Sequence, residues 1–185
     1  MSDRILSTAS YGVPVGKIVL RSIAVAGLIV GLAIGPMLLG HWSEYLRFAA
    51  SHRLHAPDLA PILRASPVIQ IHLATVLAAV GTGVVLMSGV KGTRLHRIVG
   101  WAWSTFMVLT AASALFIAAQ GPSLIFLKLF ALITLVSVPA AVLSARSHRI
   151  ARHARIMTSL FVGGIGVAGV LAFLPGRLMW QVFFG

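Results

Sequence analysis

The sequence predicts an all-α integral membrane protein: a bundle of about five transmembrane helices, with a short interfacial helix in the first outer loop. Two observations predict this fold class. Of the 185 residues, 58% are hydrophobic and only 10% are charged, whereas soluble domains contain about 45–50% apolar and about 25% charged residues. The apolar residues also form runs of about 20, the length with which an α-helix crosses a bilayer. We expect a single transmembrane domain over residues 1–185.

Each expected span is a long apolar run that ends at basic, glycine-containing or proline-containing segments. The first run follows Arg4 and Lys17 and is too long for the hydrophobic region of a signal peptide, so we interpret it as an uncleaved span. Pro175-Gly176 ends the last run. The expected spans are residues 18–39, 68–89, 99–119, 123–144 and 156–174.

Three connecting segments carry their own signals. Residues 41–66 form the one sizeable loop, and helical spacing places Trp42, Tyr45, Leu46 and Ala49 on one face. This pattern is typical of a short helix in the outer interface, with Trp and Tyr at headgroup level. Residues 120–122, Gln-Gly-Pro, predict a tight turn between the third and fourth spans. We expect the apolar tail, residues 178–184, to lie on the outer membrane surface.

The basic residues predict the orientation, because short cytoplasmic loops are enriched in Lys and Arg. With five spans, one side of the membrane holds Arg4, Lys17, Arg21, Lys91, Arg94, Arg97, Arg146, Arg149, Arg152 and Arg155. The other side holds Arg47, Arg53, Arg64, Lys128 and Arg177. We therefore expect a cytoplasmic N-terminus and an outer C-terminus in the bacterial inner (plasma) membrane.

The net charge of +12 would suit nucleic acid, but its placement between apolar runs indicates contact with anionic lipid headgroups instead. Because no soluble domain is present to carry a nucleic-acid interface, we expect no nucleic-acid partner. Membrane lipids and other membrane protein subunits are the expected partners.

Small residues recur at helical spacing in three spans, which marks surfaces where helices approach closely inside lipid. We expect these surfaces to contact helices of the same chain, with a partner subunit or a homodimer as the alternative. The small residues are Gly27, Gly31 and Gly35 in the first span, Thr75, Ala79 and Gly83 in the second, and Gly164, Ala168 and Ala172 in the fifth.

Histidines are the remaining carriers of chemistry. The chain has no cysteine, and no carboxylate lies within a span. Phosphate-binding loops, His-Glu-x-x-His pairs and nucleophile elbows are also missing. His72 lies in the second span on the face of Thr75 and Ala79 and should point into the bundle. It is either a structural residue bonded to a neighbouring helix, or a haem ligand or quinone contact.

His96 and His153 each begin a span and are flanked by arginines. We expect the two histidines to lie near one another at the cytoplasmic surface, with an external anion between the cations. Lipid phosphate, a haem propionate, a quinone head or an acidic patch of a partner are the alternatives. The surrounding cations are Arg94, Arg97, Arg149, Arg152 and Arg155.

A bis-histidine haem needs two imidazoles on facing helices at one depth. The sequence permits an outer pair, His41 with His72, and an inner pair, His96 with His153. A metal site in the outer loop, which holds His41, His52 and His55, is a weaker hypothesis, and the metal is unknown.

Three blocks carry a resemblance to a known family. They are Ile71-His72, the segment from Gly92 to Trp101 (Gly-Thr-Arg-Leu-His-Arg-Ile-Val-Gly-Trp), and residues 153–157 (His-Ala-Arg-Ile-Met). Over roughly residues 68–174 the chain is similar to domain of unknown function 2306, a family of predicted membrane proteins. The chain departs from the family pattern at Thr158, where a basic residue is expected. The resemblance implies a multi-helix membrane protein with three notable histidines and no established activity.

Three functions remain open. The first is a non-catalytic accessory or assembly subunit that packs against a larger membrane complex, as the small size and the glycine surfaces suggest. The second is a membrane redox module that binds b-type haem or quinone through His72, His96 and His153. The third is a small transporter or lipid-binding protein. Of these, a non-enzymatic subunit is the leading expectation.

Overall fold

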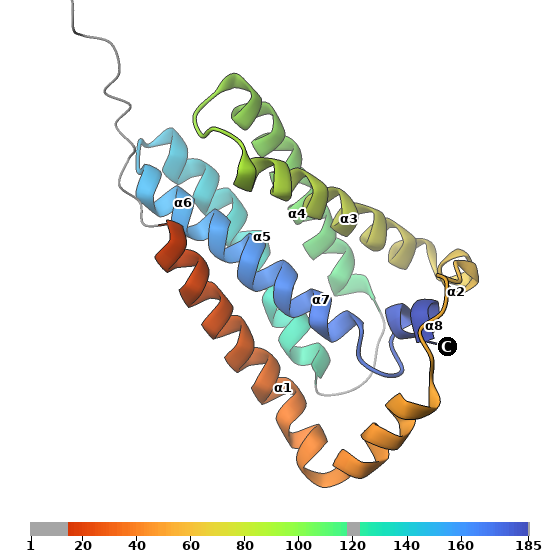
Figure 1. Cartoon of the computed structure of the whole chain (residues 1–185). Helices are drawn as coiled ribbons and strands as arrows, with labels where there is room; N and C mark the ends of the chain where they lie inside the picture. Colours follow the sequence, from red (N-terminus) through yellow and green to blue (C-terminus); the bar gives the residue numbers. More distant parts are fainter. Residues whose placement is uncertain (1–14, 118–122, 185) are drawn as a thin grey trace, which may run out of the picture.

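The computed structural model describes residues 15–117 and 123–184, and within them it contains helices and no strand (Figure 1). Five segments are long and apolar enough to cross a membrane, which confirms the predicted all-α membrane bundle. These segments are Val15–Leu32, Pro67–Ser88, Arg94–Phe116, Leu127–Arg146 and Ile150–Ala172. The predicted turn at residues 120–122 lies outside the described residues.

The described helices begin and end as follows: α1 Val15–Ser51, α2 Ala60–Arg64, α3 Pro67–Ser88, α4 Arg94–Phe116, α5 Ser123–Arg146, α6 Ile150–Ser159, the π-helix η1 Leu160–Ile165, α7 Gly166–Ala172 and α8 Leu178–Phe184. The third and fifth spans begin several residues earlier than predicted. Thr93 caps α4, because its Oγ1 accepts a hydrogen bond of 3.1 Å from the backbone N–H of His96. The basic residues therefore belong to the first helical turns.

Residues 41–51, where a short helix was predicted, are helical, but they continue α1 rather than form a helix of their own, and α1 changes direction in its second half (Figure 1). Pro36 lies within α1 and lacks the N–H that would bond the carbonyl of Leu32, and a proline is a common cause of such a kink. The side chains of Trp42, Tyr45 and Ala49 lie outside the described set.

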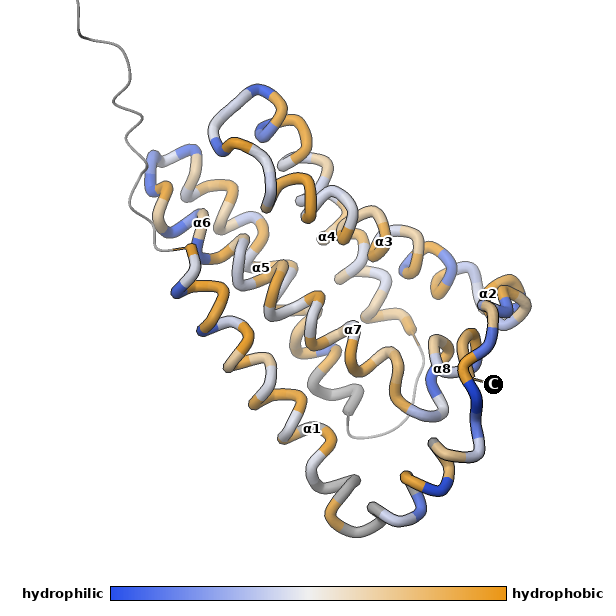
Figure 2. Tube along the Cα trace, in the orientation of Figure 1, coloured by the Kyte–Doolittle hydropathy of each residue, from blue (hydrophilic) through white to orange (hydrophobic). Residues whose placement is uncertain are grey.

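From α3 to α6, each helix packs on the next helix along the chain. The helix α4 packs between α3 and α5, and α5 packs on α6. The first helix, α1, packs on α6, η1 and α7, so it lies at the edge of the bundle, beside the last span (Figure 1). Hydrophobic residues recur along the bundle helices (Figure 2), and α1, α3, α4 and α5 each carry several exposed large apolar side chains, as expected of helices that face lipid. The core cluster consists of Ala79, Trp103, Met107, Val138 and Leu160.

The last span changes from α to π geometry for six residues at η1, before α7 continues it. Two glycines admit aromatic rings at this level. Gly83 of α3 lies against the ring of Phe161, and Gly164 lies against the ring of Phe130. A Cβ added at Gly83 would also lie 2.9 Å from the indole Nε1 of Trp103. The helices α3, α4, α5 and the last span can thus approach closely because Gly83 and Gly164 have no side chain.

The opposite end of the bundle is closed by the tail. The helix α8 contacts α2 and α7, and its carbonyls accept two backbone hydrogen bonds from the chain that follows α1. These run from the N–H of His55 to the carbonyl of Phe183 (3.0 Å) and from the N–H of Asp58 to that of Val182 (2.9 Å). The tail therefore packs on the first loop, which the sequence did not predict.

Candidate functional site

The basic end of the bundle is defined here as the α3–α4 connection (residues 89–93), the α5–α6 turn (residues 147–149) and the helix turns that adjoin them. His96 lies on the first turn of α4 and His153 on the first turn of α6, so the structure places both at this end. The helix α5 packs against both α4 and α6. The two histidines therefore lie on helices that flank α5, at the same end of the bundle.

His153 is held in one orientation. Its Nδ1 lies 3.0 Å from the backbone carbonyl oxygen of Ala141 on α5. A carbonyl only accepts hydrogen bonds, so Nδ1 carries the proton and donates it. In the neutral ring Nε2 then presents a lone pair. Histidines that bind metals use this arrangement, because the second nitrogen is fixed by a carbonyl or carboxylate.

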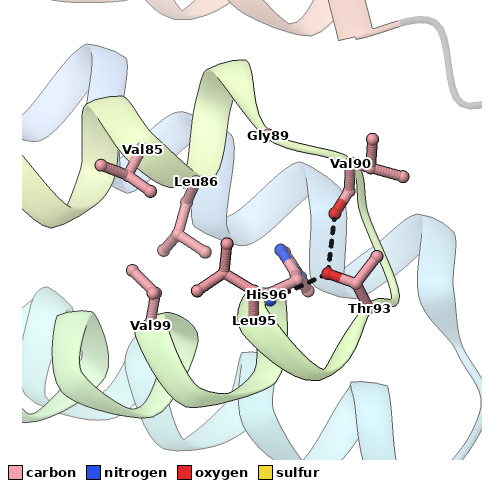
Figure 3. A pocket seen from close by; sticks show the side chains of 8 residues that line it. All are labelled: Val85, Leu86, Gly89, Val90, Thr93, Leu95, His96 and Val99. Carbon is pink, nitrogen blue, oxygen red and sulfur yellow. Dashed lines mark hydrogen bonds between the residues drawn. The ribbon is translucent and has the colours of Figure 1, made fainter.

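The ring of His96 has no hydrogen-bond partner among the described residues. It projects from α4 toward the α3–α4 connection and lines a cavity of about 320 Å³ (Figure 3). The lining residues are Val85, Leu86, Gly89, Val90, Thr93, Leu95, His96 and Val99. A titratable ring thus stands at the edge of an apolar hollow.

Both histidines sit at one end of the bundle core. Seven residues, or about two helical turns, separate His96 from Trp103, and the same interval separates His153 from Leu160. Residues at this interval share a helix face. Because Trp103 and Leu160 are core residues, the imidazoles lie on the faces of their helices that turn toward the interior.

Arginines surround this pair but do not enter the core. All five arginines of the predicted anion site are exposed, and their side chains have no ion pair or hydrogen bond within the described chain: Arg94, Arg97, Arg149, Arg152 and Arg155. Lys17 and Arg21, also exposed, lie on the first turns of α1, which packs on α6. The basic end therefore presents cationic groups with no counter-charge of their own in the described residues.

Lys91 has a different role, which sequence reasoning missed. Its Nζ donates to the carbonyl oxygens of Leu86, Met87 and Gly89 at 2.7–2.8 Å. These carbonyls belong to the last turn of α3 and its cap, which have no helical N–H partners. A cation at a helix C-terminus is also favoured by the helix dipole. Lys91 thus completes the C-terminal end of α3.

His72 lies near the other end, inside a polar seam between α3 and α4. Its Nδ1 lies 3.0 Å from both the carbonyl of Thr110 and the Oγ of Ser113. Thr110 Oγ1 in turn donates to Thr75 Oγ1 at 2.9 Å. Interhelical bonds of this kind join membrane helices. His72 therefore has a structural role in this seam, and it lies at the other end of the bundle from His96 and His153.

The two outer histidines whose side chains are described each lie against a nearby backbone carbonyl. His52 bonds the carbonyl of Phe48 and packs beside Trp180, and His55 Nδ1 bonds the carbonyl of Ala56. The side chain of His41, the predicted partner of His72, lies outside the described side chains. In the part of the chain that the structure describes, no three potential metal ligands gather.

The small-residue surfaces divide into two groups. Thr75, Ala79 and Gly83 are buried in the bundle. In the first span, a Cβ added at Gly27, Gly31 or Gly35 meets no atom of the described chain within 4 Å, so the described residues do not make the contact expected for this face. The physical reason is that α1 packs through the face of Ser22, whose Oγ bonds Ser159 Oγ at 3.1 Å. Nine residues, half a turn out of phase, separate Ser22 from Gly31.

The fold and this site together define a multi-pass α-helical membrane protein that carries histidines at the basic end of its bundle. A family described as "Predicted membrane protein (DUF2306)" matches residues 68–184, more than half of the chain. The chain belongs to this family, which confirms the resemblance and extends it through α8. The match omits α1 and α2. The comparison with curated proteins found no match, and neither did the comparison with solved structures.

Proposed function

We propose that this chain is a membrane redox module that binds b-type haem between His96 and His153. The observation that carries the proposal is the orientation of His153, whose Nδ1–H donates to Ala141 and leaves Nε2 as a ligand lone pair at the end of the bundle that also holds His96. Haem held by two histidines needs this donor set. When bound, haem supplies one-electron transfer.

The other residues of the basic end suit the same ligand. The exposed arginines offer planar, charged donors for the two propionates, and arginine pairs carboxylates well. Below the pair, Trp103 and Leu160 provide the apolar surroundings that a porphyrin requires. We infer that this end faces the cytoplasm of a bacterial inner membrane, because the arginines and lysines cluster there. Without haem, the arginines would hold anionic lipid headgroups.

The first prediction tests the ligand. Protein made with ample haem precursor and purified in detergent is expected to show a Soret band, with sharp α-bands on reduction. His153→Asn should abolish these bands, because the amide can keep the hydrogen bond to Ala141 but offers no Nε2. His148→Asn is the matched control. His148 lies in the same turn with a backbone φ of 57°, a conformation that asparagine tolerates. A featureless spectrum of the wild-type protein would refute the haem proposal.

A second candidate function, an accessory subunit, is favoured by one observation. Gly27, Gly31 and Gly35 form a smooth face directly opposite the packed face of α1 and contact nothing in the described chain. Such faces admit a partner helix at close range. The partner would be another membrane protein subunit or a second copy of this chain.

The second prediction concerns this face. Gly31→Leu should leave the thermal stability of the isolated chain in detergent unchanged, because the space at Gly31 is open. It should reduce association with a partner or copy in cross-linking of native membranes, and Gly31→Ala should reduce it less. Equal cross-linking of the wild type and both variants would mean that lipid covers this face.

A further inference from the structure

The cavity beside His96 is a feature of the basic end that the haem proposal does not use. It lies between the last turn of α3 and the first turns of α4, with a volume of about 320 Å³ (Figure 3). This volume is at the lower end of the range for small-molecule sites, about 300–1,000 Å³. Five of its eight lining residues are valine or leucine. The cavity therefore suits a ligand that is mainly hydrocarbon.

Exposed apolar side chains border the opening of the cavity. Val85, Val90 and Leu95 line it, and they are 47%, 78% and 62% exposed. In a membrane bundle, exposed apolar side chains of this kind contact acyl chains. A ligand would enter from the bilayer, and a long apolar tail would remain in it.

The cavity offers one free polar group. Thr93 Oγ1 already accepts from the N–H of His96 and contacts the carbonyl of Val90. The ammonium of Lys91 is occupied by three carbonyls at the end of α3. The imidazole of His96 alone has no partner in this part of the described chain, and a partly buried polar group favours one. The occupant should offer a hydrogen-bonding oxygen to His96.

We propose that this cavity binds the head group of a membrane quinone, with His96 as its hydrogen-bond partner. A quinone is a neutral, flat ring with carbonyl oxygens and an apolar tail, so it matches the lining, the lipid-facing opening and the single polar group. A phospholipid headgroup would place its phosphate where no lining residue is a free cation. A plain acyl chain would leave the imidazole without a partner.

This inference rests on the proposed function, because electron transfer to the quinone would come from the haem. The quinone would lie on one side of His96 and the haem on the other. An imidazole has two distinct nitrogens. If Nε2 binds iron, Nδ1–H remains available to a quinone carbonyl. Binding itself is tested separately from haem, because Val85 touches only the cavity and His153 only the proposed haem site.

The test uses the full-length protein in detergent and decylubiquinone as the probe. Val85→Phe fills the cavity and should weaken binding about tenfold or more, which corresponds to about 1.4 kcal/mol. Val84→Phe is the matched control, because Val84 is 54% exposed on the same turn and does not line the cavity. His96→Leu should weaken decylubiquinone binding and leave the binding of dodecanol unchanged.

The outcomes separate the two proposals. His153→Asn should abolish the haem spectrum and keep decylubiquinone binding, and Val85→Phe should do the reverse. Quinone binding without any haem spectrum would support the cavity and refute the haem site. The cavity proposal is overturned if the wild type does not bind decylubiquinone, if Val84→Phe and Val85→Phe weaken that binding equally, or if His96→Leu weakens dodecanol binding as much as decylubiquinone binding.

Discussion

Gly83→Ala is expected to destabilise the protein by about 1–3 kcal/mol, the usual cost of overpacking a core. The added Cβ would overlap the ring of Phe161 and lie 2.9 Å from Trp103 Nε1. Trp103 is only 3% exposed and has no room to move. The indole Nε1 of Trp103 is buried and has no hydrogen-bond partner in the described residues. Moving the indole would therefore gain no hydrogen bond to offset the overlap. The loss should appear as a lower midpoint in thermal unfolding in detergent.

The matched control for this change lies one half-turn away. Gly81 is on the same helix, and a Cβ added there meets no atom within 4 Å. Alanine is favoured over glycine in a helix by up to about 1 kcal/mol. Gly81→Ala should therefore leave the midpoint unchanged or raise it. Equal destabilisation by both alanines would mean that α3 does not approach Trp103 as the structure has it.

Gly164→Ala should be destabilising by a similar amount, but it should be open to rescue. The added Cβ would overlap only the ring of Phe130, which packs on the core from α5. In a Phe130→Leu background the ring is gone, so the alanine should cost much less than in the wild type. Residues in contact commonly couple by 0.5–3 kcal/mol or so in such double-mutant cycles.

Gly166→Ala is the control for this cycle, because Gly166 is exposed and its added Cβ meets nothing within 4 Å. Its effect should be the same with Phe130 and with Leu at that position. Additive effects of Gly164→Ala and Phe130→Leu would contradict the contact. A rescue would show that the π-helix turns Gly164 toward Phe130 of α5, as the structure has it.

The membrane spans were predictable because each is a run of apolar residues long enough to register in composition alone. The first residues of the third and fifth spans were not predictable, because the arginines in the first turns of α4 and α6 have the composition of a loop. Thr93 shows which signal was available: a threonine three residues before His96, as in a helix N-cap. The π-helix had no such signal, because its wide turns are stabilised by packing against α3 and α5.

The candidate site was predictable in its residues and not in its geometry. Helical spacing and flanking arginines pointed to His96 and His153. The proton on Nδ1 of His153 depends on a carbonyl twelve residues away, on another helix. Lys91 looked like one more surface cation until its three carbonyl acceptors were seen. The glycines of α1 indicated a contact, but only the packed face of Ser22 tells which side is left open.

The pairing of α1 with the last span has a consequence for biogenesis. Ser22 bonds Ser159, which the ribosome adds 137 residues later. At about 5–20 residues per second, that interval lasts about 7–27 s. The backbone hydrogen bond from His55, in the segment after α1, to Phe183 of the tail forms later still. During this time α1 sits in the membrane without its intramolecular neighbours, and both its serine face and its glycine face are open to lipid, insertion factors or another chain.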